Sequence, residues 1–202
     1  MKIAEVKHKS FGEGPRSNTT IWASGCSIRC PFCFNPDLWA ANGSETSTQE
    51  LMEIVAEGVR QGDTGLALVG GEPLDQMESV LELLTQVKAR FPGHVTTLYS
   101  GMTWDQLAIR PNFWRITTHL NYLVDGPFVA ELKDDMLGYR GSSNQRVINV
   151  QYTLQYQRIM LENWDNLIVV AKDTIVFPPY LSIFDQETHE TISEICGKSK
   201  SR

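Results

Sequence analysis

Three cysteines in one short loop constrain the fold of this chain more than any other feature. They are Cys26, Cys30 and Cys33, at positions i, i+4 and i+7, and they directly follow residues 18–23, a segment rich in β-branched and aromatic residues. Cysteine thiolates bind iron–sulfur clusters, and a four-iron cubane with three protein thiolates leaves one iron for a small-molecule ligand. A structural zinc site instead takes four ligands in short pairs, and the remaining cysteine, Cys196, is far away in the sequence. The loop is therefore predicted to hold a [4Fe–4S] cluster.

Strand-like and helix-like segments alternate after the cysteine loop. A capping-box pattern at 47–50 and apolar residues at helical spacing predict a first helix, and a second such pattern ends near Pro92 and Gly93. The predicted strands cover residues 18–23, 66–69, 95–99 and 122–124, whereas residues 1–16 are interpreted as a turn-rich lead-in. This alternation predicts an α/β fold with a parallel sheet, and there are too few units for a closed eight-stranded barrel.

Composition narrows the class of protein. The chain has 202 residues with 42% hydrophobic residues, which suits one globular domain, and we expect a core at 1–150 with a partly ordered C-terminal extension of unknown role at 151–202. A formal net charge of −6 gives no basic surface for nucleic acid. No apolar run reaches the roughly 20 residues that a membrane span needs. We expect a cytoplasmic protein with neither nucleic acid nor membrane as partner, since thiolate ligation suits a reducing compartment.

Two glycine-containing turns follow predicted parallel strands. Gly70, Gly71 and Glu72 come after the strand at 66–69, and Ser100 comes after the strand at 95–99. Glycines let the backbone approach a ligand closely, and α/β proteins place their sites at the carboxyl ends of parallel strands. By themselves these turns are common, so their residues alone do not establish a site.

The cysteine loop, including the aromatic Phe32 before the last cysteine, resembles the signature of radical S-adenosylmethionine enzymes. The resemblance implies a partial, open parallel β/α barrel in which the open iron binds S-adenosylmethionine and an electron from the cluster cleaves it, producing a radical that abstracts hydrogen. It further implies that Gly70, Gly71 and Glu72 contact the cofactor's amino group, that Ser100 lies near its ribose and carboxylate, and that Phe32 packs against its adenine.

A second block makes the resemblance narrower. Residues 122–128 contain a Val-Asp-Gly turn at Asp125, and residues 140–146 read Arg-Gly-Ser-Ser-Asn-Gln-Arg. Together with Trp39 and the Cys-Phe-Asn sequence at 33–35, these segments resemble the activating proteins of anaerobic ribonucleotide reductase over residues 11–150. The resemblance implies a glycyl-radical reductase as partner and a low-potential electron donor such as flavodoxin or ferredoxin. Asp125 and the 140–146 loop are candidates for shaping the cofactor site or docking the partner.

Two other functions stay open at this point. A radical enzyme acting on a small molecule, such as a deazapurine synthase, would carry the same cysteine triplet. A noncatalytic iron–sulfur protein is the alternative from a different class, although the sequence contains no further cysteine cluster that would indicate an electron carrier.

Overall fold

The computed structural model describes residues 1–163, 169–170 and 174–175. Its main feature is a seven-stranded sheet in the order β3-β1-β2-β4-β5-β6-β7. The four central strands are parallel: β2 (Asn18–Ala23), β4 (Gly65–Gly70), β5 (Val95–Tyr99) and β6 (Tyr122–Asp125). Antiparallel strands flank them, with β1 (Lys2–Ser10) and β3 (Ser44–Glu45) on one side and β7 (Arg146–Asn149) on the other. The fold is α/β with an open sheet, as the alternation of segments predicted, but the sheet is mixed, since β1, β3 and β7 pair antiparallel where a parallel sheet was predicted.

The two long predicted helices are confirmed, and their local causes are visible. In α1 (Thr48–Gln61), Ser47 and Glu50 form the predicted capping box, and Gly62 ends the helix in a left-handed conformation. The second helix, α2 (Met77–Arg90), follows the short 3₁₀ helix η2 (Pro73–Gln76). A second capping box, between Thr103 and Gln106, starts the short helix α3 (Trp104–Ala108).

The expectation of a turn-rich lead-in is wrong for the first ten residues, which form β1. The inward–outward alternation of this strand is broken by two register shifts, one between Ile3 and Glu5 and one between Lys7 and Ser10. Its lysines and Glu5 face solvent at the side of the sheet. Such an interrupted pattern conceals a strand from periodicity analysis. Besides the short 3₁₀ helices, four further elements of residues 1–163 were not predicted: β3, α4 (Phe113–Thr117), β7 and α5 (Val150–Tyr156).

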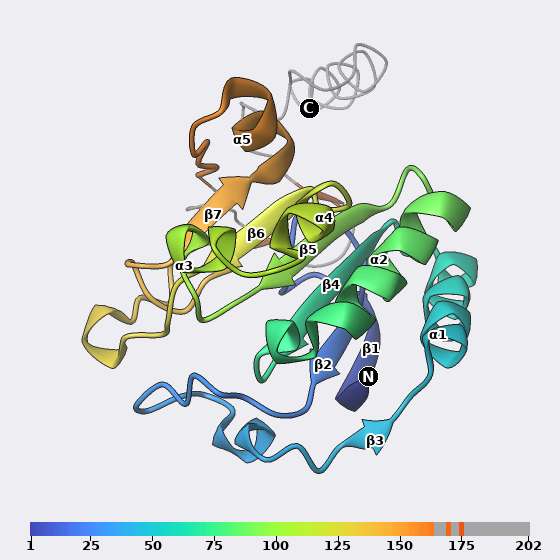
Figure 1. The fold of residues 1–202 in the computed structure, drawn as a ribbon, viewed down its shortest axis with the longest axis horizontal. Coiled ribbons are helices and arrows are strands. Elements are labelled where there is room, and N and C mark those ends of the chain that lie inside the picture. The colour runs from blue at the N-terminus through green and yellow to red at the C-terminus, as the bar shows by residue number, and fades with distance from the viewer. Residues whose placement is uncertain (164–168, 171–173, 176–202) are drawn as a thin grey trace, which may run out of the picture. The chain divides into compact units, whose positions relative to one another are not determined.

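The two faces of the parallel strands have different roles. Ile21, Leu68, Leu98 and Leu123 belong to the hydrophobic core together with α1 and α2, which lie next to each other over the sheet (Figure 1). The alternate residues Trp22, Val69 and Tyr99 instead line a cavity. Because side chains of a strand alternate between faces, one face anchors the helices and the other is available for a ligand.

Residues 1–163 form one compact unit, and residues 164–202 form a second one. The second unit contains β8 (Val169–Val170) and β9 (Thr174–Ile175), which pair antiparallel. The proposed boundary at residue 150 stays a prediction, and Cys196 lies outside the described residues.

Two shorter 3₁₀ helices complete the first unit, η1 (Pro36–Trp39) and η3 (Ala130–Leu132). In the described part of the chain, no helix combines the length and the apolarity that a membrane span requires.

Candidate active site

A cavity of about 430 Å³ lies at the carboxyl ends of the parallel strands. Most of the residues predicted from the sequence line it: Cys26, Cys30, Cys33, Gly70, Gly71, Glu72 and Ser100. Its other walls include the strand face described above, residues 12–13, Phe128 and the segment 137–141. The structure therefore brings the cysteine loop and the glycine-containing turns into one site, as the order of the strands predicted.

The cysteine loop is a tight turn whose start is fixed by backbone hydrogen bonds. At its start, the amides of Gly25 and Cys26 donate to the carbonyls of Leu38 and Trp39, at 2.8 and 3.2 Å. Arg29 and Phe32, one residue before Cys30 and Cys33 respectively, adopt the left-handed conformation with φ of 53° and 57°. Left-handed non-glycine residues cost free energy and persist where the surroundings impose them, often at functional sites.

The donor set suits a cluster bound by thiolates. All three cysteines are half-buried and none forms a disulfide. Backbone amides point at each sulfur: those of Ile28 and Arg29 at Cys26, that of Phe128 at Cys30, and that of Asn35 at Cys33 with an N–Sγ distance of 3.4 Å. Burial raises the pKa of the Cys26 and Cys30 thiols, and these hydrogen bonds oppose the shift. Hydrogen bonds of this kind tune iron–sulfur clusters, so the residues present fit a [4Fe–4S] group.

The arrangement differs from that of a mononuclear metal site. Within the described ranges, no three histidine, cysteine or acidic side chains are close enough to share one metal ion. A cubane does not require such convergence, because each thiolate binds a different iron.

Gly70 and Gly71 hold the cysteine loop against the end of β4. The Gly71 amide donates to the carbonyl of Ala23 at 2.9 Å, and the Glu72 amide donates to that of Gly25 at 2.8 Å. A Cβ at Gly71 would lie 2.1 Å from the Gly25 oxygen, and one at Gly70, where φ is +108°, would lie 2.6 Å from the backbone of Ala23. The sequence predicts that these glycines let a ligand approach the backbone. In the structure, close contact with the backbone of the cysteine loop already requires glycine at both positions.

The Glu72 carboxylate joins the ends of β4 and β5. Its Oε1 accepts a hydrogen bond from the Leu74 amide at 3.0 Å, and its Oε2 accepts from the Gly101 amide at 2.8 Å and the Ser100 hydroxyl at 3.1 Å. Although the residue is fully buried, none of these donors carries a charge. Burial raises the pKa of Glu72 to about 7, and the three hydrogen bonds oppose that shift. An uncompensated buried carboxylate at a cavity wall is suited to a cationic ligand.

Asp125 takes a different part from the one that the sequence suggested. It is 1% exposed and does not line the cavity. Its carboxylate accepts hydrogen bonds from Arg146 Nε at 2.9 Å and Arg146 Nη2 at 2.5 Å. The Trp104 amide donates to the same carboxylate at 2.6 Å. Asp125 thus fixes the start of β7 and of α3, and contact with a cofactor stays a prediction for it.

The loop at 140–146 is held by this pair and by its own amides. Gln145 Oε1 accepts from the amides of Gly141 and Ser142 at 2.9 and 3.2 Å, while its Nε2 donates to the Gly126 carbonyl at 3.1 Å. Asn144 donates to the Pro127 carbonyl at 2.8 Å. These contacts place Arg140, Gly141 and Gln145 in the cavity wall.

Phe32 is, after Asp125, the second predicted residue that does not line the cavity. Its side chain is 80% exposed. Packing of Phe32 against an adenine stays a prediction, which only its neighbouring backbone could satisfy in this conformation.

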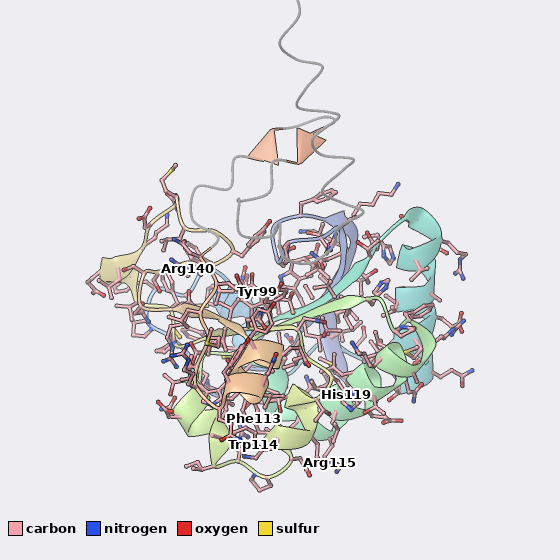
Figure 2. The ribbon with its side chains drawn as sticks, turned by 90° about the horizontal axis from the view of Figure 1, so that it is seen from above. Tyr99, Phe113, Trp114, Arg115, His119 and Arg140 are labelled. Atoms are coloured by element: carbon pink, nitrogen blue, oxygen red, sulfur yellow. The ribbon has the colours of Figure 1, made fainter. Side chains whose placement is uncertain are left out.

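Sequence reasoning missed three contributors to the site. Tyr99 ends β5 in the cavity wall and donates to the Tyr139 carbonyl at 2.6 Å, and Figure 2 shows it on the side of Arg140, away from Trp114. Asp75 accepts from both the amide and the hydroxyl of Ser27 at 2.7 Å and so anchors the cysteine loop. Phe128 supplies the amide at Cys30. Tyr99 could have been identified as the last residue of a predicted parallel strand, whereas the other two contacts have no signal in the sequence.

Comparison with known proteins supports the same site. Residues 11–148 match the family model of the 4Fe-4S single cluster domain. The anaerobic ribonucleoside-triphosphate reductase-activating proteins of Salmonella typhi and Escherichia coli K12 are 35% and 33% identical over 139 residues, which cover 66% of this chain and 89% of each relative. The protein of that name from Enterobacteria phage T4 is 29% identical over 140 residues, covering 68% of this chain and 86% of the relative. The chain thus belongs to the 4Fe-4S single cluster domain family and, within it, to the family of anaerobic ribonucleoside-triphosphate reductase-activating proteins.

Proposed function

We propose that this protein is a radical S-adenosylmethionine enzyme that generates a glycyl radical on an anaerobic ribonucleoside-triphosphate reductase. One observation carries the proposal: three thiolates, the Gly70–Glu72 segment that packs against the cysteine loop (the clamp) and the Ser100 turn all line one cavity. The chain also belongs to the activating-protein family. The four parallel strands with helices packed on one face support a partial barrel of the radical S-adenosylmethionine type.

In this proposal Cys26, Cys30 and Cys33 would hold a [4Fe–4S] cluster. When bound there, such a cluster would supply the electron that cleaves S-adenosylmethionine reductively. Overall, one electron, S-adenosylmethionine and a glycine residue give methionine, 5′-deoxyadenosine and the glycyl radical. A low-potential donor such as flavodoxin or ferredoxin would provide the electron, in the reducing environment of the cytoplasm.

The protein's own contribution is orientation and charge. Glu72, fully buried and held by three neutral donors, would accept the cationic amino group of S-adenosylmethionine, and ionisation of the carboxylate would become favourable next to that charge. The glycines keep the clamp close to the cysteine loop, so that the carboxylate and the thiolates are placed by the same backbone contacts.

The reduced, reconstituted protein should give a cluster whose electron paramagnetic resonance spectrum changes when S-adenosylmethionine is added. Further addition of the reductase should yield a stable glycyl-radical signal on the reductase, together with 5′-deoxyadenosine. If 5′-deoxyadenosine forms and a purine precursor is consumed, while no radical appears on the reductase, the small-molecule alternative is favoured. A cluster that does not respond to S-adenosylmethionine would favour a noncatalytic iron–sulfur protein.

A further inference from the structure

Exposed apolar side chains gather beside the entrance of the cavity. Among the described residues, nine large apolar side chains are exposed. Five of them lie on segments that line the cavity or adjoin its wall: Phe11, beside Gly12 and Glu13, and four on the segments 32–34 and 128–137. We call these four the mouth surface: Phe32, Phe34, Leu132 and Met136, with exposed fractions of 80%, 58%, 43% and 72%. Isolated exposed apolar residues are ordinary, but a group of them around a site indicates an interaction surface.

Contacts through Phe34, Phe128 and Lys133 join the two segments. The rings of Phe34 and Phe128 lie 4.6 Å apart, and the Lys133 ammonium lies 5.4 Å from the centre of the Phe34 ring. A Cβ at Gly141 would lie 3.1 Å from the Phe34 ring, so the 140–146 loop closes against the same aromatic pair. Cys33 and Phe34 from the first segment and Leu137 from the second reach the cavity wall.

The charges around the mouth surface are mainly acidic. The exposed charged residues of the two segments and their immediate flanks are Arg29, Asp37, Glu131, Lys133, Asp134 and Asp135. Lys133 is already paired with Asp135 at 3.0 Å, which leaves acidic groups in excess. A partner that covers this surface therefore needs apolar side chains together with basic ones.

We propose that the mouth surface is the docking site for the glycine-bearing face of the reductase, and that this face is apolar with basic residues around it. The inference rests on the proposed function: a backbone glycine can reach the cavity only if the surface around that glycine covers the entrance. Phe and Met are enriched at the centres of protein interfaces, because they bury large apolar area. Apolar contact would exclude water from the cavity during the reaction, and the acidic groups would orient the approach.

The test uses the reconstituted protein under anaerobic conditions with the reductase as the titrated partner. Leu132→Ala/Met136→Ala removes apolar surface without touching the cavity wall, and we expect the reductase concentration for half-maximal radical formation to rise about tenfold. Asp134→Lys/Asp135→Lys should raise it as well, and added salt should then lower it, because the changed charges repel the basic face and salt screens that repulsion. In both variants the cluster spectrum and the formation of 5′-deoxyadenosine without reductase should stay unchanged.

The matched control removes apolar surface of similar exposure elsewhere. Ile109→Ala/Tyr156→Ala, at side chains 86% and 55% exposed, should leave the half-maximal concentration unchanged. Equal half-maximal concentrations for the mouth-surface variants and the unaltered protein would overturn the docking site while leaving the proposed function intact. Failure of the unaltered protein to form any radical on the reductase would overturn both. If the mouth-surface substitutions abolish self-association but leave reductase affinity unchanged, the surface belongs to a second copy and the proposal is wrong.

Discussion

Two buried carboxylates at the carboxyl ends of parallel strands differ in their partners. Glu72, just after β4, is held by neutral hydrogen-bond donors and lines the cavity, whereas Asp125, at the end of β6, is paired with the Arg146 guanidinium and lies outside it. The sequence predicts a cofactor contact for Glu72, and for Asp125 a part in shaping the cofactor site or docking the partner. The difference indicates that the charge of Asp125 is already used to hold the fold, while that of Glu72 is available to a cation.

The cysteine loop gives the largest expected effect, because its three thiolates are the proposed ligands of the cluster. Alanine at Cys26, Cys30 or Cys33 should abolish cluster binding, measured as iron and sulfide content and by visible absorption, because three thiolates are the minimum for the open-iron arrangement. A Cys196→Ala variant should keep the cluster. Loss of the cluster in that variant would mean that a fourth protein thiolate is required, which contradicts the proposed open iron.

The Asp125 region should respond chiefly in stability. Arg146→Gln leaves the Asp125 carboxylate buried without its counter-charge and should lower the free energy of unfolding by about 3–5 kcal/mol. Urea unfolding followed by circular dichroism measures this. Asp125→Asn/Arg146→Gln, which removes both charges, should recover much of the loss. Equal losses in the single and double variants would show that the ion pair does not hold this region.

Alanine substitutions at glycines of the two regions should differ in their cost to stability. The cost should be larger where the glycine is packed more closely. Gly71→Ala places a Cβ 2.1 Å from a backbone oxygen of the cysteine loop and should lower stability by about 3 kcal/mol, with a weakened cluster. At Gly126 the nearest atoms to such a Cβ are 3.8 Å away, so Gly126→Ala meets only the strain of a φ of +98° and should cost about 1–2 kcal/mol. Urea unfolding curves and the iron content of both variants test this comparison. Similar losses of stability at both positions would show that the packing of Gly71 against the cysteine loop is not needed.

The raised pKa of Glu72 predicts that the stability of the protein depends on pH. In the folded protein its pKa is about 7, against an ordinary value of 4.5, so the folded state retains a proton that the unfolded chain releases. Stability should therefore fall as pH rises from 4.5 to 7, by at most about 3 kcal/mol. The difference between the unaltered protein and Glu72→Gln, measured across this window, isolates the contribution. A difference that does not change with pH would show that Glu72 ionises normally.

The smallest effect concerns the affinity for S-adenosylmethionine. Glu72→Gln keeps the shape and should weaken binding about ten- to hundredfold, because a charge-assisted hydrogen bond contributes about 1.5–3 kcal/mol. Asp125→Asn should change it by less than about twofold, since Asp125 lies outside the cavity. Isothermal titration of the reconstituted proteins compares the two, and the opposite ranking would reverse their assigned roles.

The sequence by itself determined the elements that depend on local patterns. The capping box at Ser47 and Glu50, the apolar spacing of α1 and α2 and the β-branched strands all act within a few residues. They predict parallel strands joined by helices, and therefore that the cysteine loop and the glycine turns meet at one edge of the sheet. The spacing of Cys26, Cys30 and Cys33 is likewise a local property that carries its chemistry with it.

The tertiary structure decided how each predicted residue is used. The pairing of Asp125 with Arg146, the clamp of Gly71 on Gly25 and the amide of Phe128 at Cys30 join residues 21 to 98 positions apart in the chain. Strand β1 was also recognisable only through its partners, since its bulges break the alternation that periodicity relies on. A carboxylate that binds a cation and one that is neutralised by an arginine have the same local sequence signal, because the electrostatic environment that separates them is assembled only when distant strands pack together.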